Sequence, residues 1–379
     1  MKQTSRILSI YAADTAGVCS ALYELGGMTV IHDASGCNST YSTHDEPRWT
    51  KQESMIYISA LTELDAVMGN DEKLIEDIAS TASSLHPRFI TLCSSPVPVM
   101  IGTDFEAVAA AIEKRTGIPA VSIPTDGMHS YLVGASDAFR MLAARFCTAD
   151  PAKAPGCTVN LLGATPLDFS DGPIVPSIRR WLVENGFTAG ACFSMGSTPD
   201  ELARAGGASV NLVLSWDGLA AARVLKARFG TPYVVGVPVG EGFSREVAEA
   251  IRRAAESGAD EITCSRRGGS GGTAVVGESV YAGSLACALS RDAGQSAFVL
   301  CPLETEPDFL APGDKTVREE PEIEALFRGA SAIVADPLYR PVCPVGTPFV
   351  PLAHEAFSGR CFHALMPDLI GKNLGKAGF

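Results

Sequence analysis

The sequence lacks the features that would place it in several common functional classes. Its 379 residues hold no apolar run of the ~18 residues that a membrane helix needs. The start, MKQTSRILSIYAAD, is too short for a signal peptide and is soon interrupted by Asp14. Basic residues are outnumbered, with 30 Lys and Arg against 43 Asp and Glu, so we expect no basic surface for nucleic acid. We therefore predict a cytoplasmic protein that binds no membrane and no nucleic acid.

Three familiar ligand-binding patterns are missing as well. Neither the G-x-x-x-x-G-K-[ST] phosphate loop nor a G-x-G-x-x-G dinucleotide fingerprint follows any strand-like run. The Gly-rich stretch RRGGSGGTAVVGES precedes its strand, whereas a phosphate site needs the glycines between strand and helix. We predict a linker or hinge there, and the basic pair Arg266-Arg267 that opens it is given no partner. The 11 cysteines include no C-x-x-C pair, which excludes zinc-ribbon spacing.

What the chain does contain is a regular alternation of short apolar runs with amphipathic segments. This alternation is typical of parallel sheets covered by helices. Residues 71–85 place Leu74, Ile75, Ile78, Ala82 and Leu85 on one helical stripe, and a second helix stops at Gly258. Strands are expected at TVIH, MIYISA, RFITLCS, PAVSIP, TVNLLG, VNLVLS, PYVVGVP, TAVVG, SAFVLC and SAIVAD, among others.

A weak internal repeat suggests how many domains there are. Gly117-Ile118-Pro119, Gly230-Thr231-Pro232 and Gly346-Thr347-Pro348 each precede a strand-like run, at separations of 230 − 117 = 113 and 346 − 230 = 116 residues. Such near-equal spacing favours three similar α/β domains. Stretches rich in Pro, Gly and small residues mark the expected seams. The predicted domains are residues 1–150, 151–267 and 268–379.

Two cysteines stand out in the first domain. In parallel α/β sheets, ligands collect at the carboxyl ends of the strands. Cys37 follows Gly36 in a polar loop after one strand, and Cys93 lies where another strand ends. Two thiolates on one face make half of a four-cysteine iron-sulfur site, and a second subunit across a twofold axis would supply the other half.

The same stretches carry a family resemblance. Four of them resemble, in order and spacing, the first domain of the nitrogenase component 1 superfamily, which includes nitrogenase molybdenum-iron protein subunits, dark-operative protochlorophyllide reductase subunits and a nickel-tetrapyrrole reductase. Three further stretches look like its second and third domains, so the resemblance covers nearly the whole chain. The seven stretches are VIHDASGCNSTYS, LDAVMGNDEKLIEDI, FITLCSSPVPVMIGTDFEAV, IPTDGMHS, CFSMGSTPDELARA, NLVLSWDGLAAARVLKARFGTPYV and ADPLYRPV.

The resemblance implies three Rossmann-like domains in a dimer or tetramer, and an iron-sulfur cluster at the subunit interface. It also implies a partner, an iron protein of the nitrogenase reductase type that binds MgATP and delivers the electrons. By position, Cys37 and Cys93 match two cluster ligands, whereas Ala13 occupies the place of a third cysteine. Cys19, further into the expected helix, is either a ligand or a core residue.

The missing cysteine bears on the type of cluster. Two cysteines per chain suit one 4Fe-4S cluster shared between two subunits, in a homodimer or with a related subunit, whereas three would permit a larger one. The catalytic subunit of nitrogenase holds its iron-molybdenum cofactor through a cysteine where this chain has Leu214 or Ser215. Dinitrogen reduction is therefore not expected.

Several other polar residues are candidates for the site. His32 and Asp33 end a strand beside Cys37, where they either donate protons to a substrate or serve as a space-filling side chain and a cap. His44 and Arg48 are predicted to line a substrate cavity or a docking rim, unless they form a solvated ion-paired loop. In the third domain His354, Glu355, Arg360 and Arg340 are predicted to face the same cleft between domains, or else to be structural.

The sequence as a whole predicts a nitrogenase-like reductase component that passes electrons from the iron protein, through the cluster, to a small organic substrate, tetrapyrrole-like in some relatives. The alternative is a scaffold on which an iron-sulfur metallocofactor is assembled. A third reading is a ligand-binding protein that uses the cleft without redox chemistry.

Overall fold

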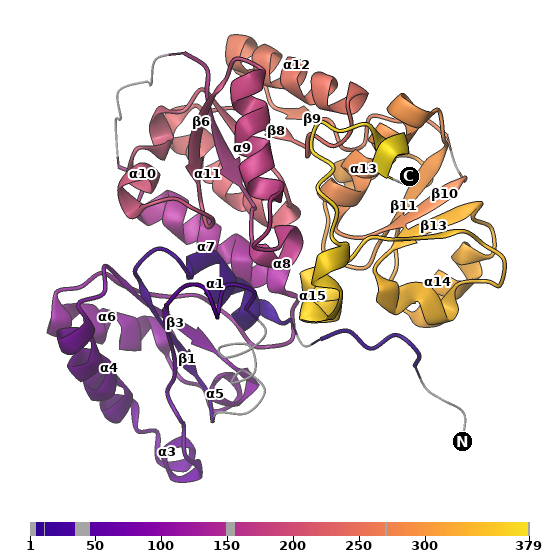
Figure 1. The fold of residues 1–379 in the computed structure, drawn as a ribbon. Coiled ribbons are helices and arrows are strands. Elements are labelled where there is room, and N and C mark those ends of the chain that lie inside the picture. Colours follow the sequence, from indigo (N-terminus) through magenta and orange to yellow (C-terminus); the bar gives the residue numbers. More distant parts are fainter. Residues whose placement is uncertain (1–4, 11, 35–45, 149–155, 270, 378–379) are drawn as a thin grey trace.

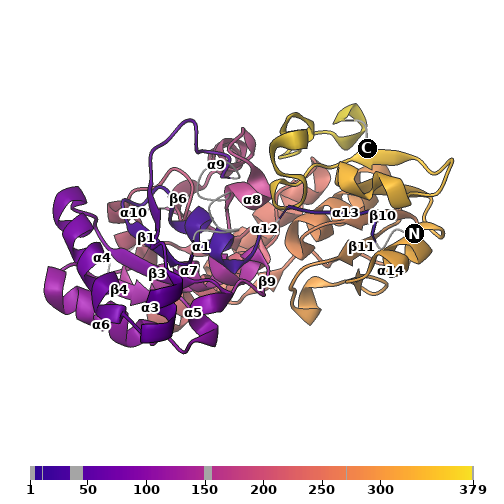
Figure 2. The same ribbon diagram turned by 90° about the horizontal axis from the view of Figure 1, so that it is seen from below.

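The computed structural model describes residues 5–10, 12–34, 46–148, 156–269 and 271–377. Within them the chain forms three separate sheets, every strand pair of which is parallel (Figure 1). The first and third sheets lie toward opposite ends of the molecule, as the view from below shows (Figure 2). The fold is therefore α/β with three parallel sheets and flanking helices, as the sequence predicted.

The strand orders are β2-β1-β3-β4, β6-β5-β7-β8-β9 and β12-β11-β10-β13-β14. The strands are β1 (Met28–His32), β2 (Met55–Ile58), β3 (Ile90–Ser94), β4 (Ala120–Ser122), β5 (Thr158–Leu162), β6 (Thr188–Cys192), β7 (Val210–Val213), β8 (Tyr233–Val235), β9 (Glu261–Ile262), β10 (Thr273–Val276), β11 (Ala297–Cys301), β12 (Lys315–Thr316), β13 (Ala332–Ala335) and β14 (Phe349–Pro351).

Helices connect the strands and cover the sheet faces. The α-helices are α1 (Asp14–Leu22), α3 (Glu63–Met68), α4 (Asp71–Leu85), α5 (Pro96–Met100), α6 (Phe105–Thr116), α7 (Tyr131–Arg145), α8 (Pro166–Phe169), α9 (Ile174–Glu184), α10 (Pro199–Ala203), α11 (Leu219–Phe229), α12 (Gly242–Ser257), α13 (Ser279–Ala293), α14 (Glu320–Phe327) and α15 (Glu355–Ser358). The 3-10 helices are η2 (Ala205–Gly207), η3 (Trp216–Gly218), η4 (Pro307–Phe309), η5 (Pro337–Val342), η6 (Gly359–Leu365) and η7 (Leu374–Ala377). No helix in these ranges is both long and apolar enough to span a bilayer.

All the strands named from the sequence are present. The repeated Gly-x-Pro tripeptides directly precede β4, β8 and β14, which occupy equivalent places in the three sheets. Gly117 and Gly230 adopt the left-handed conformation, with φ of 71° and 72°. This conformation ends the helix that precedes each strand. One detail of the helical stripe was wrong, because Leu85 at the end of α4 is 41% exposed.

Helices α1 and α7 cross in backbone contact, and two glycines make this possible. A Cβ atom on Gly17 would lie 1.8 Å from the carbonyl oxygen of Tyr131, and one on Gly134 would lie 1.8 Å from that of Asp14. No other residue fits at either position without separating the helices. Because α7 also packs on α11, this crossing links the first sheet to the second.

One continuous hydrophobic core runs from α1 through the second sheet to one face of the third, and smaller cores cover the remaining faces of the first and third sheets. Arg267, which the sequence left without a partner, is buried and ion-paired with Asp314 at 2.5 Å. The start of the Gly-rich stretch is thus anchored to the third sheet. The domain limits proposed at residues 150 and 267 stay predictions.

Candidate functional site

The strand tips of the first sheet hold two of the predicted site residues. His32 ends β1, and its Nδ1 lies 2.7 Å from the hydroxyl of Ser59 at the end of β2. Burial is the main cause that lowers the pKa of His32. The carboxylate of Asp33 accepts a hydrogen bond of 2.6 Å from the Ser95 hydroxyl. Both side chains therefore have partners within the fold, and their role as proton donors stays a prediction.

Cys93 lies inside β3, with no exposed surface, and its thiol faces the carbonyl oxygen of Val30 at 3.7 Å. Its hydrogen bond with the thiol of Cys19 on α1 is the first cause that raises its pKa well above the usual range, and burial is the second. Cys19 is buried too. Both thiols are therefore buried in the core beneath α1 of this chain.

This arrangement bears on the implied iron-sulfur cluster, which binds thiolates. In the described ranges, no cysteine belongs to a group of three or more ligating side chains close enough to share an ion. This does not test the predicted site, which takes two cysteines from each subunit and includes Cys37, so the ligand roles of Cys93 and Cys19 stay predictions. Cys37 lies outside the described residues, as does His44.

Arg48 does not form part of a docking rim. Only 4% of its side chain is exposed, and it pairs with Glu46 at 2.6 Å and with Glu24 at 2.9 Å. Its guanidinium also lies over the ring of Tyr23. Arg48 thus ties the turn after residue 45 to the end of α1, because a guanidinium taken from water has to be paired.

A different set of polar side chains comes together where the second and third sheets meet. The loops after β5, β7, β10 and β14 converge there, and α8 packs against α15 (Figure 1). Ligands of open α/β sheets bind at the carboxyl ends of the strands. We call this set the junction; its members are Tyr131, Asp168, Asp217, Glu278, His354 and Glu355.

One half of the junction is a hydrogen-bonded trio. Oδ1 of Asp168 accepts a hydrogen bond of 2.5 Å from the Tyr131 hydroxyl and lies 3.0 Å from Nε2 of His354. The backbone N–H of His354 donates to Asp336 at 2.8 Å, which fixes the residue at the start of α15. His354 therefore meets Asp168 across the boundary between the second and third sheets.

The other half consists of two buried carboxyl groups. Burial, and then the charges of Asp168 and Glu278, raise the pKa of Asp217 well above its usual range. Burial, and then the charge of Asp168, raise the pKa of Glu278 to about 7. Glu278 caps α13 by accepting the backbone N–H groups of Val280 at 3.0 Å and of Tyr281 at 2.9 Å. Burial among other acids thus favours the protonated form of Asp217, and the pKa of Glu278 lies close to neutral pH.

Glu355 is a further buried acid of the junction, and burial raises its pKa. Its carboxylate pairs with Nδ1 of His363, which also lies 3.0 Å from the Ser170 hydroxyl. Arg340 is not part of the junction. Its exposed guanidinium stacks on the ring of Phe349, 5.1 Å from the centroid, and its place in a cleft between domains stays a prediction.

Several buried polar atoms at the junction make no hydrogen bond of good geometry to any residue that the structure describes. Buried polar groups in proteins are nearly always hydrogen-bonded, and exceptions point to bound water, a ligand or a chemical role. Some buried atoms in the loops after these strands make no hydrogen bond of good geometry within the described residues. They are Oγ1 of Thr165, Oδ2 of Asp168, Oγ of Ser215, Nε1 of Trp216, both Oδ atoms of Asp217, the hydroxyl of Tyr281, Nδ1 of His354 and Oε2 of Glu355.

Sequence reasoning missed Asp168, Asp217 and Glu278, although it named His354 and Glu355. The signal was present, because each of the three follows an expected strand: β5, β7 and β10. The rule that ligands collect at carboxyl ends was applied to the first domain alone. Applied to all three domains, it would have found the junction.

Comparison with known proteins identifies the class. A sequence model of the nitrogenase component 1 type oxidoreductases matches residues 15–268. The match covers well over half of the chain, and the chain belongs to this family.

The curated relatives are of two kinds. One is a subunit of the light-independent protochlorophyllide reductase from Methylobacterium radiotolerans, which is 28% identical over 192 residues, 48% of this chain and 36% of that protein. The other is a nitrogenase iron-molybdenum cofactor biosynthesis protein NifE from Sinorhizobium fredii, which is 28% identical over 208 residues, 53% of this chain and 40% of that protein. The chain thus spans less than half the length of these relatives.

Two solved structures share the fold. Nitrogenase Cp1 at pH 5 superposes with a TM-score of 0.63 at 16% identity, over 94% of this chain and 85% of that one. Nitrogenase Cp1 at pH 6.5 gives the same TM-score at 15% identity, over 100% and 91% of the two chains.

The raised pKa of Glu278 predicts a pH dependence of stability. The native state keeps this proton up to about pH 7, whereas the unfolded chain loses it near the ordinary value of 4.5. The unfolded state then binds fewer protons than the folded state. The contribution of Glu278 to the free energy of unfolding is therefore full below pH 4.5 and is lost as the pH rises to 7. Between these two pH values the free energy of unfolding of wild type should fall by roughly 3 kcal/mol more than that of Glu278→Gln.

Urea unfolding at both pH values measures this difference. Glu249→Gln is the matched control, because Glu249 is exposed. Equal losses in wild type and Glu278→Gln would show that Glu278 is not protonated in the folded protein.

Proposed function

We propose that the chain is the substrate-binding component of a nitrogenase-like reductase, and that the junction binds and protonates an organic substrate. The observation that carries this proposal is the complete burial of Asp217 beside Asp168 and Glu278, which raises its pKa well above the usual range against the opposing hydrogen bonds of Ser215 and Gly218. A carboxylic acid kept protonated at neutral pH donates hydrogen bonds and protons. Reduction of an organic double bond needs such a donor beside the electron supply.

The other junction residues support the same chemistry. Glu278 interacts electrostatically with Asp217, and its pKa of about 7 suits it to return a proton to that group after each turnover. Asp168 holds the tyrosine hydroxyl and the imidazole of His354 in fixed positions. Because the Nε2 edge of His354 faces this carboxylate, the ring proton lies on Nε2 in the neutral tautomer.

Substrate enters when the parts of the chain built on the second and third sheets move apart. The junction is covered by α8 and α15, which are helices of four residues each and pack on one another. Separating them would open the carboxyl ends of both sheets while leaving the sheets intact. Closure then excludes water from the acids, which is how lids and domain movements commonly act in enzymes.

The electron supply belongs to the same proposal and rests on the family resemblance. It comprises an iron protein that uses MgATP and a 4Fe-4S cluster shared with a second, identical or related subunit, with Cys37 as one ligand. Such a cluster supplies single electrons when bound. The described cysteines add no support for it, so no chemical step is derived through it here.

A second candidate is a scaffold for the assembly of a metallocofactor, which the similarity to NifE proteins favours. A scaffold for an iron-sulfur cofactor needs thiolates at the place of assembly. Cys301 lies near enough to Glu278 to interact with its charge, but burial raises the pKa of this thiol to about 12. The junction thus offers acids and one imidazole, which favours the reductase.

The test is turnover under anaerobic conditions with an iron protein of the nitrogenase reductase type, MgATP and protochlorophyllide, the pigment named for one group of relatives. We expect reduction by wild type and a loss of at least about hundredfold in Asp217→Asn, with circular dichroism unchanged. Asp308→Asn, at an exposed position, is the control. Lack of reduction by wild type would contradict the pigment as substrate, and equal rates in both variants would contradict the role of Asp217.

A further inference from the structure

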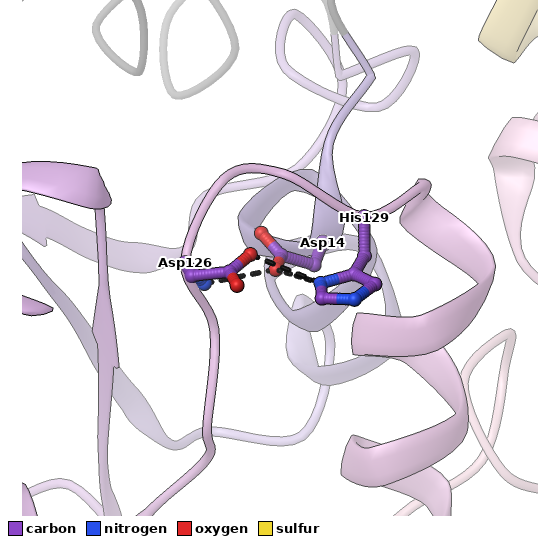
Figure 3. A group of neighbouring side chains, drawn as sticks. All are labelled: Asp14, Asp126 and His129. Atoms are coloured by element: carbon purple, nitrogen blue, oxygen red, sulfur yellow. Dashed lines mark hydrogen bonds and ion pairs between the residues drawn. The ribbon is translucent and has the colours of Figure 1, made fainter.

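Three side chains outside the junction converge where α1 begins (Figure 3). Asp14 is the first residue of α1, whereas Asp126 and His129 lie in the loop between β4 and α7, more than a hundred residues later. One ligand atom from each of the three lies within 4.8 Å of the other two. We propose that Asp14, Asp126 and His129 bind a divalent transition-metal ion, a role that is independent of the proposed reductase function.

Asp14 is held in place by the backbone. Its carboxylate accepts N–H groups from Thr15 at 2.7 Å, from Asp126 at 2.9 Å and from Gly127 at 3.0 Å. These bonds, together with the close crossing of α1 and α7, fix the carboxylate before any ion arrives. A fixed ligand lowers the entropic cost of binding, which is what a metal site requires.

The imidazole of His129 lies beside the two carboxylates. Nδ1 of His129 lies 3.0 Å from Oδ1 of Asp126 and 3.9 Å from Oδ2 of Asp14. Asp126, through its hydrogen bond and then its charge, raises the pKa of His129, to which Asp14 and Glu304 also contribute. A metal ion would replace the proton on Nδ1 and take over its position, since both need the same lone pair and the same carboxylates.

The site is open to solvent and to a cavity. The side chain of His129 is 56% exposed. Asp126 and His129 also line a cavity of about 800 Å³ beside β4, together with Thr125 and Arg140. An ion bound by three protein ligands would therefore keep free coordination positions toward this cavity.

The donor set defines the class of ion. Two carboxylate oxygens and one imidazole nitrogen suit Mn²⁺, Fe²⁺ or Zn²⁺ better than Ca²⁺ or Mg²⁺, which prefer oxygen alone. Mn²⁺ is the better probe here, because it has little affinity for thiols and the chain carries 11 cysteines. It is also paramagnetic, so binding is read directly from the loss of the free-ion signal.

The experiment is a titration of the full chain with Mn²⁺, followed by electron paramagnetic resonance. We expect one ion per chain in wild type, and affinity at least about tenfold weaker in Asp126→Asn and in His129→Gln. His86→Asn is the matched control, since His86 is exposed and its left-handed backbone accepts asparagine.

Two results would overturn the proposal. One is the absence of stoichiometric binding to wild type at pH 8. The other is equal affinity in wild type, His129→Gln and Asp126→Asn, which would place the bound ion elsewhere. Both variants change loop side chains that are at least one-third exposed, so circular dichroism should show an unchanged fold. The reductase test uses a different residue, so either proposal can fail alone.

Discussion

Replacing Gly134 by alanine should destabilise the protein by about 3 kcal/mol or more, because overpacking against backbone cannot be relieved by a change of rotamer. The new methyl group would lie 1.8 Å from the carbonyl oxygen of Asp14 and 2.6 Å from its carbon. Relief requires α1 and α7 to move apart, which also pulls Asp14 away from the loop of Asp126. Gly17→Ala should have a similar effect from the other side of the crossing.

Urea unfolding followed by circular dichroism measures this change. Gly268→Ala is the control, because a Cβ atom there meets nothing within 4 Å and its φ is not in the left-handed region. An unfolding midpoint of Gly134→Ala equal to that of Gly268→Ala would contradict the close crossing of α1 and α7.

The second large effect concerns the buried ion pair of the third sheet. The side chains of Arg267 and Asp314 are 2% and 1% exposed, and Asp314 also accepts the backbone N–H of Val299 at 2.8 Å. Arg267→Met leaves this carboxylate buried without its cation, which should cost about 3–5 kcal/mol. Adding Asp314→Asn removes the uncompensated charge, so the double variant should be more stable than Arg267→Met alone.

The neighbouring arginine provides the control for this experiment. Arg266 pairs with Glu261 at 2.8 Å, but its side chain is 42% exposed. Arg266→Met should therefore change the free energy of unfolding by no more than about 1 kcal/mol. Similar losses in Arg266→Met and Arg267→Met would contradict the account of a buried, essential pair.

Much of the fold could be predicted from sequence because its strands are short apolar runs bounded by Gly, Pro and polar residues. The strands β6, β9 and β12 were not named. β6 reads TAGAC, whose Gly and Ala have little strand preference, and the other two contain two residues each. These edge strands form because a neighbouring strand offers unpaired backbone groups, and a local pattern does not show that.

The site was harder to predict than the fold. His354 and Glu355 were named without a partner, and the structure supplies one, Asp168, which lies 186 residues earlier than His354. Cys93 looked like a strand-tip residue, yet its thiol points under α1. The direction in which a side chain at a strand end points depends on the register of the strand and on the helix that covers it. The spacing of residues in the sequence therefore could not predict the direction of the Cys93 thiol.

The buried acids also depend on tertiary structure. Nothing in the local sequence of Asp217 distinguishes it from an ordinary helix-start aspartate. Its raised pKa comes from burial and from Asp168 and Glu278, which reach it from other loops. A prediction of protonation state from sequence would need that three-dimensional neighbourhood.

The central claim is that the junction holds a neutral carboxylic acid at the pH at which the protein works. Infrared difference spectroscopy of wild type against Asp217→Asn at pH 7.5 tests it directly, since the protonated carboxyl group has its own carbonyl band, which shifts in deuterium oxide. We predict that this band is present in wild type and absent from Asp217→Asn. Identical carboxyl bands in the two proteins at pH 7.5 would show that Asp217 is ionised and would contradict the proposed proton donor.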